Sequence, residues 1–100
     1  MVPTAVQTYI ENNRQAILDS LFELLRFPSI ANVSDPDGCR PCAQFLQAYL
    51  AEAGFAAELL EAPNAQPAVF AEHHEGDDLP TLLIYGHYDV QPADPLDLWD

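Results

Sequence analysis

An uncharged apolar run, Thr81-Leu-Leu-Ile-Tyr85, is followed directly by Gly86 and His87 and, two residues later, by Asp89. A run of this kind is typical of a strand covered on both faces, as at the centre of an α/β sheet. Ligands of such sheets bind beyond the carboxyl ends of the strands, where His87 follows. Alternate residues of an extended segment point the same way, so His87 and Asp89 are expected to share a face. A carboxylate beside an imidazole fixes its tautomer, so the pattern predicts a metal ligand or a general base.

A His-x-Asp pair after a strand is also common as a capped turn or a surface ion pair, so the surrounding residues matter. The segment Gly86-His-Tyr-Asp-Val-Gln-Pro92, followed by Trp99, resembles the first metal motif of the di-zinc exopeptidases. That family includes carnosine-type dipeptidases, acetylornithine and succinyl-diaminopimelate deacylases, aminoacylases and glutamate carboxypeptidases. The sequence of this motif is most similar to that of the dipeptidase branch. The resemblance extends back through Leu24-Leu-Arg-Phe-Pro-Ser-Ile30 and Ala53-Gly-Phe55.

The resemblance implies that His87 is a zinc ligand and that Asp89 is a catalytic residue that orients it. It also implies a fold, the N-terminal part of a mixed-sheet α/β catalytic domain, and a reaction, hydrolysis of an amide bond in dipeptides or N-acyl amino acids. The family's other groups lie farther along the chain and have no counterpart here. Residues 1–100 are therefore expected to be the N-terminal portion of the catalytic domain, without the lid and dimerisation domain. The full-length enzyme is expected to hold two zinc ions and to form a homodimer.

The rest of the sequence predicts two helices and a hairpin before the central strand. An apolar stripe at helical spacing predicts a helix over about Thr4–Arg26, ending before Pro28. A second stripe predicts a helix over about Arg40–Ala53, with Gly54 as its C-terminal cap. Residues 55–61 and 68–72 read as two short antiparallel strands leading to the central strand at 81–85, which gives an α/β fold rather than a bundle.

The charge of the chain excludes some partners. Sixteen acidic residues against three arginines and no lysine give a formal net charge of −13. Such a surface repels phosphate backbones and anionic lipids, so nucleic acid and membrane partners are not expected. No secretory signal and no apolar stretch of membrane-spanning length is visible, which favours a cytoplasmic protein.

A second hypothesis uses Cys39 and Cys42, which form a Cys-x-x-Cys at a helix start and resemble the redox centre of thioredoxin-like proteins. The polar loop before Cys39 is unlike the buried strand of that fold, so two reduced cysteines, with Cys42 in the core, are the favoured interpretation. A third hypothesis is an inactive fragment or pseudoenzyme. The ligand-rich segment from Glu72 to Asp78 reads as a solvated turn rather than a metal site, and Trp99 is expected either to pack on the domain or to line a substrate pocket.

Overall fold

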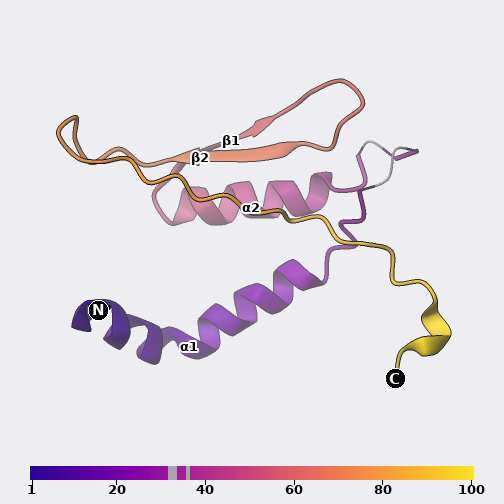
Figure 1. Ribbon diagram of the computed structural model, residues 1–100, viewed down its shortest axis with the longest axis horizontal. Helices are drawn as coiled ribbons and strands as arrows, with labels where there is room; N and C mark the ends of the chain where they lie inside the picture. Colours follow the sequence, from indigo (N-terminus) through magenta and orange to yellow (C-terminus); the bar gives the residue numbers. More distant parts are fainter. Residues whose placement is uncertain (32–33, 36) are drawn as a thin grey trace.

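Two helices come first in the chain, and both predicted helices are confirmed. The computed structural model describes residues 1–31, 34–35 and 37–100. Helix α1 spans Thr4–Leu25 and helix α2 spans Arg40–Glu52. Helix α1 contacts α2 along part of its length (Figure 1). Just after α1, the ring of Phe27 lies 5.3 Å from that of Phe45 in α2, measured between centroids.

The C-terminal end of α2 is closed by a glycine. Gly54 has φ +99°, a left-handed conformation that favours glycine, and no atom outside its neighbours lies within 4 Å of a Cβ built there. The amide of Gly54 donates to the carbonyl of Ala51, and the amide of Phe55 donates to that of Leu50. This pair of bonds is the Schellman motif, which satisfies two carbonyls at the helix end and turns the chain toward the sheet.

The predicted hairpin is also present. Strand β1 (Ala56–Leu60) pairs antiparallel with strand β2 (Ala68–Glu72), with Ala56 opposite Glu72 and Leu60 opposite Ala68. Burial alternates along both strands, because one face packs on α2 and the other is exposed. The predicted α/β fold, with two helices followed by a hairpin, is therefore confirmed.

The expected central strand at 81–85 is not formed in this structure. The segment forms no strand ladder with any described residue, and the side chains of Leu82, Leu83, Ile84 and Tyr85 are 82–89% exposed. A pocket separates it from the free edge of β2, so neither its backbone nor its apolar side chains have the cover that a central strand needs. The prediction of a buried strand here is wrong for residues 1–100. Only farther on does Val90 form an isolated parallel bridge with Ile30.

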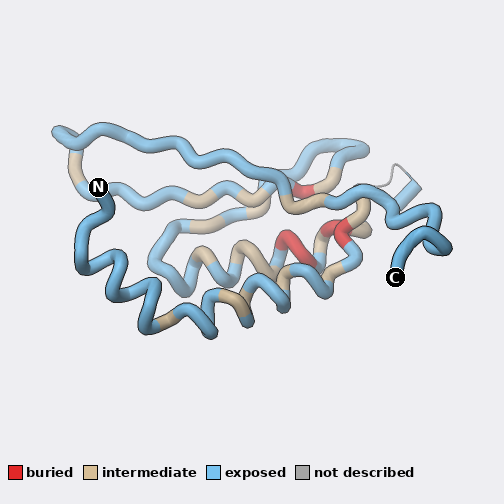
Figure 2. Tube along the Cα trace, turned by 60° about the horizontal axis from the view of Figure 1, so that its bottom comes forward, coloured by how far each residue is buried: buried red, intermediate tan, exposed pale blue. Residues whose placement is uncertain are grey.

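The buried interior is small and lies where α2 begins. Cys39, Cys42, Ala43 and Ser29 are buried, together with Pro67 just before β2 (Figure 2). The accessible surface is 8657 Å², whereas an independent globular protein of this size exposes about 5,700 Å². The radius of gyration is 16.7 Å, compared with about 13 Å for a 100-residue domain. Among the described residues, no helix is both long and apolar enough to cross a bilayer.

Candidate functional site

His87 and Asp89 contact one another as the sequence predicts. The Nδ1 atom of His87 lies 3.2 Å from Oδ1 of Asp89 and 3.0 Å from its backbone carbonyl oxygen. With the proton on Nδ1, the ring donates to Asp89 and leaves Nε2 unprotonated. Nε2 makes no hydrogen bond with the described part of the chain, and the His87 side chain is 78% exposed. The pair therefore presents an oriented imidazole with a free lone pair.

The backbone that carries this pair is anchored to Ser29, in the turn after α1. The hydroxyl of Ser29 donates to the carbonyl of Tyr88 at 2.8 Å, and the amide of Val90 donates to the carbonyl of Ser29 at 2.9 Å. Ser29 itself is only 3% exposed. Sequence reasoning assigned no role to Ser29, because a contact across 59 positions has no local pattern.

Tyr88 holds the same segment from its other side. Its phenol donates a hydrogen bond to the carbonyl of Pro67, in the buried turn before β2. Burial of the ring raises the pKa of Tyr88 to about 12, so the hydroxyl keeps its proton and its donor role well above neutral pH. Tyr88 and Pro67 line the same pocket as His87 and Asp89.

The pair opens on a pocket of about 620 Å³ between the hairpin and the segment 84–89. Its wall is mostly apolar, with His87, Asp89 and Gln66 as its main polar side chains. The lining residues are Leu24, Leu46, Leu50, Leu60, Gln66, Pro67, Ala68, Val69, Phe70, Ile84, Tyr85, Gly86, His87, Tyr88 and Asp89. The pocket is largely apolar with a few polar groups, and it is open to solvent along Ile84 and Tyr85.

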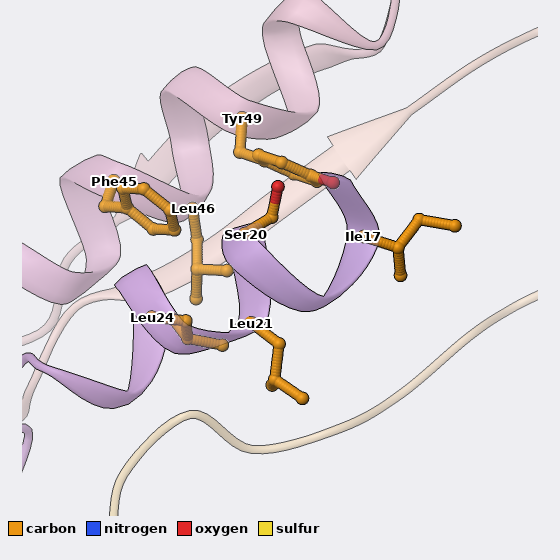
Figure 3. A pocket seen from close by; sticks show the side chains of 7 residues that line it. All are labelled: Ile17, Ser20, Leu21, Leu24, Phe45, Leu46 and Tyr49. Atoms are coloured by element: carbon orange, nitrogen blue, oxygen red, sulfur yellow. The ribbon is translucent and has the colours of Figure 1, made fainter. Parts of the chain in front are cut away.

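A second, smaller pocket of about 200 Å³ lies between α1 and α2 (Figure 3). Six of its seven lining side chains are apolar or aromatic. The seventh, Ser20, bonds its hydroxyl to the carbonyl of Ala16 in its own helix. This pocket is a gap in helix packing and has no group suited to chemistry. Trp99 lines neither pocket; it is 71% exposed and donates its indole N–H to the carbonyl of Ala93.

The two cysteines lie in the interior beside the site rather than in the pocket. Both thiols are free and buried. Burial raises the pKa of Cys39, and the negative charge of nearby Asp89 adds to the shift. Burial also raises the pKa of Cys42, although a hydrogen bond with Ser29 offsets part of it. A redox centre needs a lowered thiol pKa and access, so this environment favours two reduced structural cysteines.

His73 and His74 are occupied with local partners. His73 contacts Glu75, and this hydrogen bond raises the pKa of His73. His74 contacts Asp77. All four side chains are about half exposed or more. The segment is a solvated turn with local ion pairs, in agreement with the sequence interpretation.

A zinc ion fits the chemistry of His87 but would need further ligands. Zinc accepts an imidazole nitrogen whose other nitrogen donates to a carboxylate, which is the arrangement of His87 and Asp89. Within residues 1–31, 34–35 and 37–100, no three His, Cys, Asp or Glu side chains gather as a metal site. The described residues therefore supply one oriented ligand.

Two curated proteins that share one name are similar to this chain. The chain is 35% identical over 83 residues to a succinyl-diaminopimelate desuccinylase of Pseudomonas syringae pv. syringae. It is 33% identical over 82 residues to the protein of the same name from Ectopseudomonas mendocina strain ymp. Each match covers more than four fifths of this chain but 20% of the relative, so the chain spans about a fifth of the length of these proteins. No family model and no solved structure matches.

Proposed function

We propose that residues 1–100 are the amino-terminal portion of the catalytic domain of a zinc-dependent hydrolase that cleaves amide bonds in N-acyl amino acids or dipeptides. The contact between His87 and Asp89, which both line a largely apolar pocket, is the observation that carries this proposal. The similarity to two desuccinylases supports the same reaction class.

The shape of the chain supports the view that it is part of a larger domain. Its accessible surface exceeds that of an independent protein of this size by about 3,000 Å². The exposed residues include large apolar side chains, among them Leu82, Leu83 and Ile84, each more than four-fifths exposed. A segment of this composition is stable in water only when other parts of a protein cover it.

In this proposal His87 binds zinc through Nε2, and Asp89 is the residue that keeps Nδ1 protonated. A bound zinc supplies a Lewis acid and lowers the pKa of a coordinated water toward neutrality. Asp89 raises the basicity of the ring and fixes its direction, and the apolar pocket wall offers a surface on which the substrate can lie. The other ligands and the general base are assigned to parts of the enzyme beyond Asp100.

Two classes of substrate are candidates for this enzyme. The names of the relatives favour an N-acylated amino acid such as succinyl-diaminopimelate. The residues of the segment Gly86–Pro92, which resemble the motif of the dipeptidase branch, favour a dipeptide substrate. Neither relative is named a dipeptidase, so that branch stays a proposal, as do a homodimeric assembly and a cytoplasmic location.

Substitution of His87 tests the proposal in the complete enzyme. We expect His87→Ala to remove one of two zinc ions per subunit, measured by mass spectrometry of the purified protein, and to abolish hydrolysis of both N-succinyl-diaminopimelate and dipeptides. His74→Ala is the matched control, because His74 is also exposed and paired with an aspartate. Two tightly held zinc ions in the His87→Ala protein would contradict the assignment. Wild-type protein that holds zinc but hydrolyses neither substrate would favour the pseudoenzyme alternative.

A further inference from the structure

We infer that Ser29 is a positioning residue for the His87–Asp89 pair, fixing the backbone of Asp89 so that its carboxylate is held against His87. The role presupposes the zinc-binding function proposed above. Ser29 touches no reacting atom; it acts through the two peptide groups on either side of Asp89.

The hydrogen bonds of Ser29 enclose Asp89 on both sides. The Tyr88 carbonyl, which accepts from the Ser29 hydroxyl at 2.8 Å, belongs to the peptide group before Asp89. The Val90 amide, which donates to the Ser29 carbonyl at 2.9 Å, belongs to the peptide group after it. Two planar peptide groups bonded to one residue leave the dihedral angles of Asp89 little freedom. Ser29 therefore fixes the direction of the Cα–Cβ bond of Asp89, from which its carboxylate reaches His87.

Ser29 is itself rigidly placed. Its amide donates to the carbonyl of Phe27 at 2.8 Å, in a tight turn after α1. The residue is 3% exposed, so water has little access to replace its bonds. A buried hydroxyl donor of this kind is difficult to substitute, because its carbonyl partner then loses its bond without gaining solvent.

The hydroxyl matters for metal binding because Asp89 orients His87 through contacts of 3.0–3.2 Å. Loss of a group that orients a metal ligand lowers metal affinity or activity by roughly ten- to a hundredfold. Ser29 is one step farther from the metal than Asp89, so its removal is expected at the lower end of that range, about tenfold.

Zinc affinity of the complete enzyme tests this role. Dissociation constants are measured by competition with a chromophoric chelator, and folding is checked by thermal melting. We expect Ser29→Ala to weaken the site that contains His87 about tenfold, and Ser29→Thr, which keeps the hydroxyl, to stay within about threefold of wild type. The control is Ser20→Ala, which removes a hydroxyl bonded only within α1 and should leave zinc affinity unchanged.

Two results would overturn the role of Ser29. One is a Ser29→Ala protein that melts at a lower temperature but binds zinc as wild type does, since Ser29 would then be purely structural. The other is a Ser29→Thr protein as weakened as Ser29→Ala. If Ser29→Ala fails to fold, Ser29→Cys, which places a weaker donor of similar size there, replaces it. Wild-type zinc affinity in Ser29→Cys together with a lowered melting temperature would then overturn the role. Unchanged zinc in His87→Ala would instead refute the proposed function, so the two failures are distinguishable.

Discussion

Residues 1–100 expressed alone should not form a stable monomeric domain. The structure exposes 8657 Å², against about 5,700 Å² for an independent protein of this mass. An extended chain of this size exposes about 16,000 Å², so folding removes a little under half of its surface instead of about two-thirds. Among the described residues the buried apolar side chains are few: those of Cys39, Cys42, Ala43 and Pro67. Burial of this extent is too small to offset the conformational entropy of about a hundred ordered residues.

Three measurements on the isolated chain check this expectation. Chemical denaturation should give a broad transition with a low slope, because the slope scales with the surface newly exposed. A dye that binds apolar surface should fluoresce strongly, since Leu82 to Tyr85 are open to solvent. Small-angle scattering should give a radius of gyration at or above the 16.7 Å of the structure.

The complete protein serves as the control and should show a cooperative transition and little dye binding. A monomeric isolated chain with a radius of gyration near 13 Å, a sharp transition and no dye binding would refute the reasoning. Such a chain would have to pack residues 81–85 in a way that this structure does not.

Two further predictions concern the surroundings of the site. Tyr88→Phe in the complete protein removes the hydrogen bond to the Pro67 carbonyl. We expect it to lower the free energy of unfolding, measured by urea denaturation, by about 0.5–1.5 kcal/mol. An unchanged urea midpoint would show that this hydrogen bond does not contribute to stability. The pKa values of Cys39 and Cys42 are raised mainly by burial, so at pH 7–8.5 the folded protein holds less thiolate than free cysteine does. Alkylation by iodoacetamide should be slow in that range, rise only at higher pH and become fast after unfolding; rapid reaction of the native protein at pH 7 would revive the redox hypothesis.

The parts of the fold that sequence predicts well are those set by neighbouring residues. Both helices end where Pro28 and Gly54 predict, because these residues restrict the backbone locally. The His87–Asp89 contact was also predictable, since two residues apart in an extended chain is a local relation. Local rules therefore predicted the two helices, the hairpin and the contact between His87 and Asp89.

The missed features depend on residues far apart in the chain. An apolar run at 81–85 identifies extended backbone, but whether it is buried depends on which strands flank it, and the described residues provide none. The bonds that Ser29 and Pro67 make to Tyr88 span 59 and 21 positions. A serine after a helix and a proline in a turn have ordinary local explanations, so nothing in their neighbourhood indicates these partners.

The link between Ser29 and Tyr88 also bears on the order in which the molecule assembles. Joining residues 59 positions apart costs about 3–4 kcal/mol of chain entropy by polymer scaling. The helices and the hairpin close much shorter loops and can form before that cost is met. The geometry of the His87–Asp89 pair is thus a late product of folding, acquired only when the turn after α1 has docked against residues 88–90.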